Sequence, residues 1–350
     1  MSQSRRRDRI AQGAAAAGGR LGVPLILLLV WMGYEFVMLG GMLIMVPFAI
    51  NNFAAYDFTR SQMIAVLTIY LPLQSLLRTV KDVRAWVYTF LVVITYVGIW
   101  ATMTGGYARG GQDENYAAAL MVMALPFSYF AFTYDQRKIP RILYMSSIVI
   151  FVAAMALANN ASRGGFLALC SVGAYIIVRS PRKHIALGLL GVASVALLVV
   201  AGPSFWAEIQ TTSDFETGTG DLRLRAWQGG LRMFLAYPIF GVGPGNFSWQ
   251  LGNFETAAQV ASLGRSMGGA MVAHSMWVEG LSEVGLVGMG STLALCWHGW
   301  KGLERVQNQA RNLSRIHPRV HEFVELRGIA FAVQGSMVGV AVNGLFLSLF

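Results

Sequence analysis

Three short stretches of the chain place a strong hydrogen-bonding or titratable side chain at the edge of an apolar run: Asn160-Ala-Ser-Arg-Gly-Gly165, Arg223-Leu-Arg-Ala-Trp227 and Ala273-His274-Ser275. An arginine guanidinium can bind a phosphate group through two parallel hydrogen bonds. An imidazole, whose ordinary pKa is about 6.5, can accept a proton at neutral pH. The three stretches therefore indicate an active site at a bilayer surface that binds an anion and moves a proton.

Each arginine stretch also has a simpler interpretation. Arg163, beside Ser162, equally fits an arginine that starts a spanning helix and reaches toward the interface. Arg223 and Arg225, just before Trp227, equally fit an interfacial helix whose basic face lies on anionic lipid. Spacing alone does not choose between these interpretations and phosphate binding.

Two acids and a glycine-rich turn accompany the histidine. Glu279 and Glu283 are spaced i,i+4 and share a helix face, and acids within an apolar span usually line a cavity or pair with a cation. The stretch Gly241-Val-Gly-Pro-Gly245 lacks the Lys-Ser/Thr of a phosphate loop. It predicts a tight turn that places Asn246 near the site.

The composition indicates a membrane protein. Of 350 residues, 55% are hydrophobic and 13% are charged, with a mean hydropathy of +0.53, whereas soluble domains average about 25% charged residues. The net charge of +10 does not indicate a nucleic-acid partner, because the basic residues form short clusters between apolar runs. Cys170 and Cys296 each lie within an apolar run and are expected to be small core residues.

Basic loops alternate with other loops along the chain. All four lysines fall in one set of loops, near residues 1–20, 78–84, 135–141, 179–184 and 299–327. The positive-inside rule places this set in the cytoplasm and the segments 51–61, 104–115, 159–163 and 203–271 outside. Of the five histidines, only His274 then faces outward. No second outward histidine and no cysteine accompanies it, so a metal site is not expected, and a boundary histidine satisfied by its neighbours is the simpler alternative.

Spanning helices need about 20 mostly apolar residues. Such runs occur near residues 22–50, 62–79, 85–103, 116–134, 141–158, 163–178, 184–202, 272–298 and 328–350. The first run is long enough for a bent helix. The sequence thus predicts an all-α, polytopic integral membrane protein with about 9–11 transmembrane helices.

The segment 203–271 is the one long outward loop. Apolar residues recur in it at helical spacing, which predicts an amphipathic helix in the membrane interface that ends before Pro238; the stripe consists of Leu224, Trp227, Leu231, Phe234 and Leu235. We therefore divide the chain into N-terminal transmembrane helices (1–202), an outward loop (203–271) and C-terminal transmembrane helices (272–350).

The order of these motifs resembles that of the O-antigen ligase and O-antigen polymerase superfamily. The shared elements are Ser162-Arg163-Gly164, an Arg-x-x-x-Trp over 223–227, a Pro-x-x-Gly-x-Gly-x-Gly-Asn-Phe turn over 238–247, His274 at the start of a span, and Gly285-Leu-Val-Gly288. Each element alone is common, but their order together with the topology is specific. The resemblance covers about residues 160–290, within a ligase-like core of 150–300.

The resemblance implies a GT-C-like glycosyltransferase of the bacterial inner membrane with a periplasmic active site. Its donor would be a glycan on undecaprenyl pyrophosphate, its acceptor a glycan, lipid A-core or a protein, and it would need no metal or other cofactor. By the family pattern, Arg163 and Arg223 would bind the pyrophosphate and His274 would activate the acceptor hydroxyl. Further substrate contacts are expected from Ser162, Arg225, Trp227, Asn246, Glu279 and Glu283.

Elementary chemistry agrees with these roles. Fixed arginines stabilise the charge that grows on a departing pyrophosphate, and a histidine can take the proton of a sugar hydroxyl at neutral pH. Attack opposite the leaving group would invert the anomeric centre. The expected reaction is therefore inverting, metal-independent glycan transfer.

Two features depart from the family pattern. Ser275 stands where the family usually has Asn, and the chain ends at Phe350 inside an apolar run, which leaves room for a further helix. The sequence does not distinguish an O-antigen ligase, an O-antigen or exopolysaccharide polymerase, and a protein O-glycosylation ligase. A polysaccharide flippase, which belongs to a different class, would place charged groups in several spans, and intramembrane acids are few here. A structural membrane subunit is a further alternative.

Overall fold

The computed structural model describes residues 40–104, 114–135, 138–156, 163–200, 219–263 and 271–347. Every regular element within these ranges is a helix. The predicted all-α fold is therefore confirmed for the described part of the chain. The stretch 1–39, which holds most of the first predicted span, lies outside the described residues.

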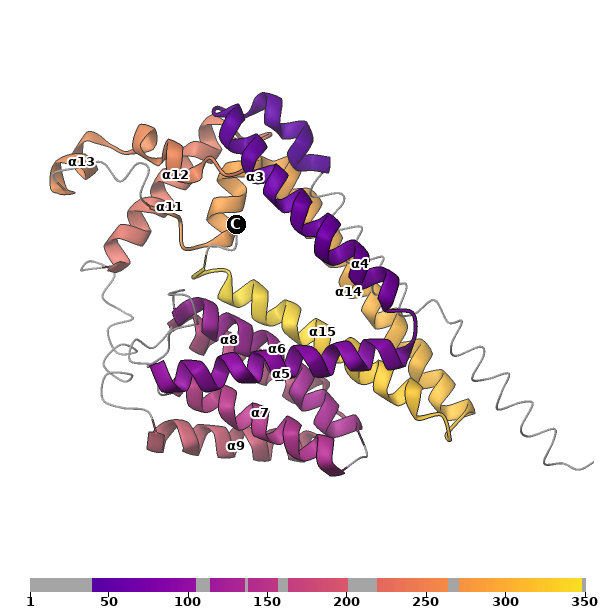
Figure 1. Cartoon of the computed structure of the whole chain (residues 1–350). Helices are drawn as coiled ribbons and strands as arrows, with labels where there is room; N and C mark the ends of the chain where they lie inside the picture. The colour runs from indigo at the N-terminus through magenta and orange to yellow at the C-terminus, as the bar shows by residue number, and fades with distance from the viewer. Residues whose placement is uncertain are drawn as a thin grey trace, which may run out of the picture.

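Six helices form the main bundle (Figure 1). They are α5 (Val80–Thr104), α6 (Glu114–Tyr134), α7 (Lys138–Ala156), α8 (Arg163–Arg179), α9 (Lys183–Val200) and α15 (His321–Asn343). Helix α6 lies at the centre, because it packs against α5, α7, α8 and α15. Fully buried Phe130, Phe151, Val122 and Val172 fill the core between these helices. The prediction that Cys170 and Cys296 are core residues is wrong, because both are exposed; an apolar run also supplies the outer, lipid-facing side of a membrane helix.

Three described helices are long and apolar enough to cross a membrane: Val80–Thr104, Asn115–Tyr134 and His321–Asn343. Three shorter apolar helices cover Pro140–Met155, Gly164–Arg179 and Lys183–Val192. All of these helices except His321–Asn343 match predicted runs, namely 85–103, 116–134, 141–158, 163–178 and 184–202. The predicted last span at 328–350 is displaced, since the helix begins seven residues earlier, at His321, and ends at Asn343.

The predicted span at 62–79 belongs to a longer helical rod. Helix α3 (Asn52–Ala65) passes through a π-helical turn, η2 (Val66–Tyr70), into α4 (Leu71–Leu76). The rod begins ten residues before the apolar run because the Asn51 side chain caps it, accepting a 3.1 Å hydrogen bond from the backbone N–H of Ala54.

Among the described elements, α14 is the longest; its 41 residues, Met276–Ile316, include a break at Gly285. The sequence predicted a span ending near residue 298 and a basic loop over 299–327. The structure corrects this, because the helix continues through most of that stretch. Leu303 and Val306 of α14 pack there against Leu326 and Ala330 of α15, so burial of apolar side chains extends the helix beyond its apolar run.

The predicted amphipathic helix is present as α11 (Thr219–Ala236). It is followed by α12 (Phe247–Gln250), η4 (Leu251–Phe254) and α13 (Ala257–Leu263). Figure 1 shows α11, α12 and α13 gathered near the start of α14, away from the bundle. Ala226 and Met233 of α11 are buried. Leu224, Leu231 and Leu235 of the predicted stripe are exposed and leave an apolar surface suited to lipid.

Candidate functional site

The glycine-rich turn over 238–247 is docked against a break in α14. The backbone N–H groups of Val242 and Gly243 donate to the carbonyl oxygens of Ser282 and Glu283, both at 2.9 Å. In return, the N–H of Leu286 donates to the carbonyl oxygen of Pro238 at 2.9 Å. The turn therefore supplies the hydrogen bonds that the helix loses at its break.

Two glycines make this docking possible. Gly285 has φ +61 and interrupts α14, and Gly241 has φ +70, a region that side chains disfavour. A Cβ atom at Gly241 would lie 2.3 Å from the carbonyl carbon of Glu283, and one at Gly285 would lie 2.5 Å from the carbonyl oxygen of Ile239. The Gly-Asn-Phe turn and the Gly-Leu-Val-Gly stretch are thus two halves of one structural joint.

Glu283 and Asn246 hold this joint together. The Glu283 carboxylate accepts hydrogen bonds from the backbone N–H groups of Phe247 (2.8 Å) and Gly245 (2.9 Å). The buried Asn246 amide donates to the carbonyl oxygen of Asn51 at 3.2 Å and accepts from the N–H of the same residue at 3.1 Å. Both side chains are engaged in the scaffold, and their binding of substrate remains a prediction. Glu279, one turn before Glu283, is equally buried.

His274 lies directly before α14 with an unusual backbone. Its φ is +48, and no other described non-glycine residue has a positive φ. Its neighbours are held on both sides. The indole N–H of Trp227 donates to the carbonyl oxygen of Ala273 at 2.8 Å, and the N–H of Met276 donates to the carbonyl oxygens of Gly344 (2.8 Å) and Leu347 (2.9 Å). Strained backbone fixed by its surroundings occurs frequently at functional sites.

The turn over Gly344–Leu347 joins the histidine stretch to the start of α8. A Cβ atom at Gly164 would lie 2.6 Å from the Cβ of Phe346, so these two residues are in close contact. Arg163 is the first residue of α8 and directly precedes Gly164. The backbone of Arg163 therefore lies at the same junction as the start of α14, whereas Ser162 lies outside the described residues.

The arginines of the outward segment 203–271 differ in their contacts. Arg225 donates to the Ser262 hydroxyl at 2.5 Å, and Arg232 donates to the carbonyl oxygen of Phe254 at 2.6 Å. Both therefore hold the segment around α13 against α11. Arg223 is half-buried and makes no hydrogen bond or ion pair within the described part of the chain. It lies one helical turn before Trp227, which places the two residues on one face of α11.

Asn343 is a candidate residue that the motifs of the sequence do not indicate. Asn343 ends α15 next to Gly344 and is 2% exposed, and its amide nitrogen and oxygen make no hydrogen bond to any described residue. The available signal was the Asn-Gly pair, which commonly ends a helix; the surrounding apolar run concealed it. Within the described ranges, no group of three or more His, Cys, Asp or Glu residues is placed to hold a metal ion.

Residues 148–293 match the family model of O-antigen ligase. The matched segment contains Arg163, Arg223 and His274, and it ends shortly after Gly288. No curated protein matches the chain. The resemblance drawn from the order of the motifs is therefore confirmed over this segment.

Proposed function

We propose that the chain transfers a glycan from undecaprenyl pyrophosphate to an acceptor sugar hydroxyl. The proposal starts from two findings: residues 148–293 match the family model of O-antigen ligase, and three described helices are long and apolar enough to cross a membrane. The transfer inverts the anomeric centre and takes place without a metal ion. It occurs at the periplasmic face of the bacterial inner membrane, with the N-terminus in the cytoplasm. Membrane-embedded helices hold the lipid tail of the donor while its pyrophosphate lies at the interface.

The observation that carries this proposal is the convergence of the three motifs at the start of α14. Trp227, from the second motif, hydrogen-bonds Ala273 of the third. The first motif reaches the same place through Gly164, which contacts Phe346. Segments about 60 and 110 residues apart in the chain are thereby linked, the first of them through the turn Gly344–Leu347, which supports a site built from several helices.

Arg163 and Arg223 bind the pyrophosphate in this proposal. Arg223 suits the role because no described acceptor occupies its guanidinium group, whereas Arg225 already donates to Ser262 and Gln259. Positive groups fixed beforehand stabilise the leaving pyrophosphate without reorganisation during the reaction. Charge on this group grows as its bond to the anomeric carbon breaks.

His274 accepts the proton of the acceptor hydroxyl. As that oxygen forms its bond to the anomeric carbon, the bond from the carbon to the pyrophosphate oxygen breaks and the electron pair leaves with the phosphate. The proton moves to the imidazole, which later releases it to water. The fixed backbone around His274 keeps the ring in place for this transfer.

Transfer by the purified, full-length protein tests the proposal. The donor is a defined glycan on undecaprenyl pyrophosphate in detergent with EDTA, and lipid A-core, a free repeat unit and a serine-containing peptide are supplied separately as acceptors. We expect a new glycosidic bond of inverted configuration to one acceptor, which also distinguishes ligase, polymerase and protein-glycosylating activities. Movement of the intact donor across a vesicle bilayer without transfer to any acceptor would identify a flippase and overturn the proposal.

A further inference from the structure

The helices that form the candidate active site form a second polar cluster at their opposite ends. Helix α8 ends at Arg179, α14 carries Arg311 near its end, and α15 carries Arg327 near its start. At a rise of about 1.5 Å per residue, Arg327 lies about 24 Å along α15 from Asn343. The basic loops of the sequence place this end of the helices in the cytoplasm.

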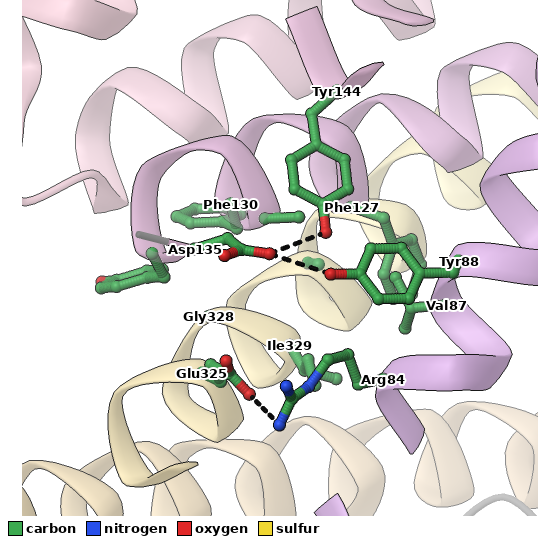
Figure 2. Close-up of a pocket in the computed structure, with 13 residues that line it drawn as sticks. Arg84, Val87, Tyr88, Phe127, Phe130, Asp135, Tyr144, Glu325, Gly328 and Ile329 are labelled. Carbon is green, nitrogen blue, oxygen red and sulfur yellow. Dashed lines mark hydrogen bonds and ion pairs between the residues drawn. The ribbon is translucent and has the colours of Figure 1, made fainter. Parts of the chain in front are cut away.

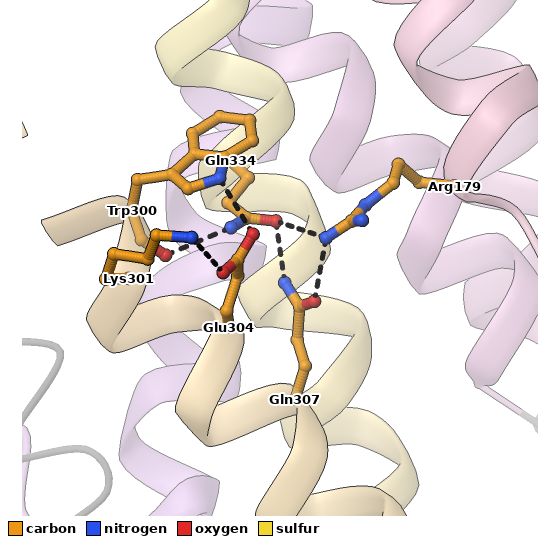
Figure 3. A network of polar contacts seen from close by, with 6 residues as sticks. All are labelled: Arg179, Trp300, Lys301, Glu304, Gln307 and Gln334. Atoms are coloured by element: carbon orange, nitrogen blue, oxygen red, sulfur yellow. Dashed lines mark hydrogen bonds and ion pairs between the residues drawn. The ribbon is translucent and has the colours of Figure 1, made fainter. Parts of the chain in front are cut away.

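A buried hydrogen-bond network fixes the first of these arginines (Figure 3). Gln334 is fully buried, and its side-chain oxygen accepts a 2.8 Å bond from the amide of Gln307 and a 3.4 Å bond from Arg179. Arg179 also donates to the side-chain oxygen of Gln307 at 3.4 Å. The network joins α8, α14 and α15, and Arg311 follows Gln307 by one turn on α14.

Contacts with aromatic rings link Arg327 and Tyr134 to Arg179. The guanidinium groups of Arg179 and Arg327 lie 5.6 and 5.3 Å from the centroid of the same Phe331 ring. Phe331 stacks on Phe130, which stacks on Tyr134 at the end of α6. Gly328, directly after Arg327, packs against the Tyr134 ring, since a Cβ atom there would lie 2.5 Å from Cδ2 of that ring. Arg311 lies one turn after Gln307 of the same network on α14. Three positively charged arginines and one tyrosine, from four helices, are linked by these contacts.

This cluster has donors without acceptors. The Nε atoms of Arg179, Arg311 and Arg327 and the hydroxyl of Tyr134 are buried and make no hydrogen bond to the described residues. Each can donate, and a buried donor without an acceptor is destabilising. No carboxylate of the described chain forms an ion pair with any of these arginines. The site lacks a group that accepts several hydrogen bonds and carries negative charge.

The nearby carboxylates have other partners. Glu304, which Figure 3 shows in the same network as Arg179, pairs with Lys301 at 3.0 Å. A cavity of about 40 Å³ lies between α5, α6, α7 and α15, and Tyr134 is one of the residues that line it. Figure 2 shows its polar side chains. In it, Glu325 pairs with Arg84 at 2.9 Å, and Asp135 accepts hydrogen bonds from the Tyr88 and Tyr144 hydroxyls at 2.9 and 3.2 Å. These acids therefore do not neutralise the arginine cluster.

We propose that Tyr134, Arg179, Arg311 and Arg327 bind the phosphate of an anionic phospholipid headgroup. A phosphate accepts several charge-assisted hydrogen bonds at once, and arginine forks match its geometry. Val178, next to Arg179 in the chain, is 70% exposed, and Ile316, at the end of α14 that carries Arg311, is 68% exposed. These apolar side chains offer a surface for acyl chains at this end of the helices, which favours a lipid over free phosphate. Basic pockets between helices at the cytoplasmic side are suited to such headgroups.

Lipid binding by the full-length protein tests this site. The protein is delipidated in detergent and titrated with phosphatidylglycerol, phosphatidylcholine or inorganic phosphate, with binding followed by native mass spectrometry. We expect saturable binding of phosphatidylglycerol that weakens at least about tenfold in an Arg311→Gln/Arg327→Gln variant, because two charge-assisted donors are lost. Tyr134→Phe, which keeps the stacked ring and removes only the hydroxyl, should weaken binding by a smaller factor of about three to ten.

The matched control is Arg305→Gln/Arg319→Gln. Both residues are exposed and lie at the same end of the molecule, so the control removes the same charge without touching the cluster. Its binding should stay within about twofold of the original protein. Equal loss in both double variants would show that general surface charge binds the lipid and would overturn the site. Inorganic phosphate binding as tightly as phosphatidylglycerol, or phosphatidylcholine binding as tightly, would overturn the assignment to an anionic lipid.

Discussion

The indole nitrogen of Trp227 donates a 2.8 Å hydrogen bond to the carbonyl oxygen of Ala273, the residue directly before His274. This bond connects the Arg-x-x-x-Trp motif with the histidine stretch. Arg223 lies one turn before Trp227 on α11. The motif that carries the proposed anion-binding arginine therefore also contacts the stretch that carries the proposed base.

Replacing Trp227 by Phe should slow transfer about tenfold and leave the protein folded, because a single hydrogen bond contributes about 0.5–1.5 kcal/mol. The comparison is Trp249→Phe, since Trp249 is 65% exposed and lies outside this contact. Initial transfer rates and thermal unfolding midpoints of both variants in detergent check the prediction. Unchanged transfer by Trp227→Phe would show that the bond does not position His274.

Arg223 and Arg225 should respond differently to substitution. Arg223→Ala and Arg223→Lys should both lower transfer by about 10- to 100-fold, because a charge-assisted hydrogen bond contributes about 1.5–3 kcal/mol and lysine lacks the planar fork. The same pair of changes at Arg163 should behave alike. Arg225→Ala should mainly loosen the contact of α11 with Ser262. Transfer rates of the variants, measured with a purified donor, check these expectations. If Arg223→Ala is active and Arg225→Ala is not, the pyrophosphate-binding arginine is Arg225 and the motif register is off by two residues.

The joint between the glycine-rich turn and α14 should not tolerate a side chain. Gly241→Ala or Gly285→Ala should destabilise the fold by at least about 2 kcal/mol, because a positive φ costs about 1–2 kcal/mol and the new Cβ meets backbone atoms. Gly290→Ala is the control, since a Cβ there has no atom within 4 Å. Thermal unfolding in detergent checks this, and equal midpoints for all three variants would refute the docking of the turn.

The orientation of the chain can be tested by labelling. In a background where Cys170 and Cys296 are replaced by serine, Pro140→Cys should react with an impermeant reagent only after the inner membrane is opened. Phe215→Cys should react in intact spheroplasts, because residues 135–141 belong to the lysine-bearing loops and 203–271 does not. Labelling of both from the periplasm would contradict this orientation and, with it, a periplasmic site.

Much of the bundle could be predicted from the sequence because its helices coincide with apolar runs. Helices α5 and α6 lie within a few residues of their predicted positions. The extension of α14 to Ile316 could not be predicted, since its last turns are polar and depend on packing against α15. Hydropathy also gave the wrong end for α15, because Gly344–Leu347 is apolar in sequence but leaves the helix to bind the backbone of Met276.

The sequence predicted the motifs of the candidate site but not their arrangement in space. The sequence placed Arg163, Arg223 and His274 on one side of the membrane without showing what brings them together. Two of the joining contacts use backbone carbonyl groups, those of Ala273 and Gly344, and every residue has one. These carbonyl acceptors therefore leave no signal in residue type or spacing.

The pH dependence of the transfer rate tests whether His274 is the general base of glycan transfer. A base must be deprotonated to act, and imidazole ordinarily titrates at about 6.5, so the rate should rise through about pH 6–7 and then level off. His274→Gln, which cannot take up a proton, should be slower by about 10²–10⁴ while it still binds the donor. A rate that is flat above pH 5 together with an active His274→Gln variant would contradict the account and move the role to another group.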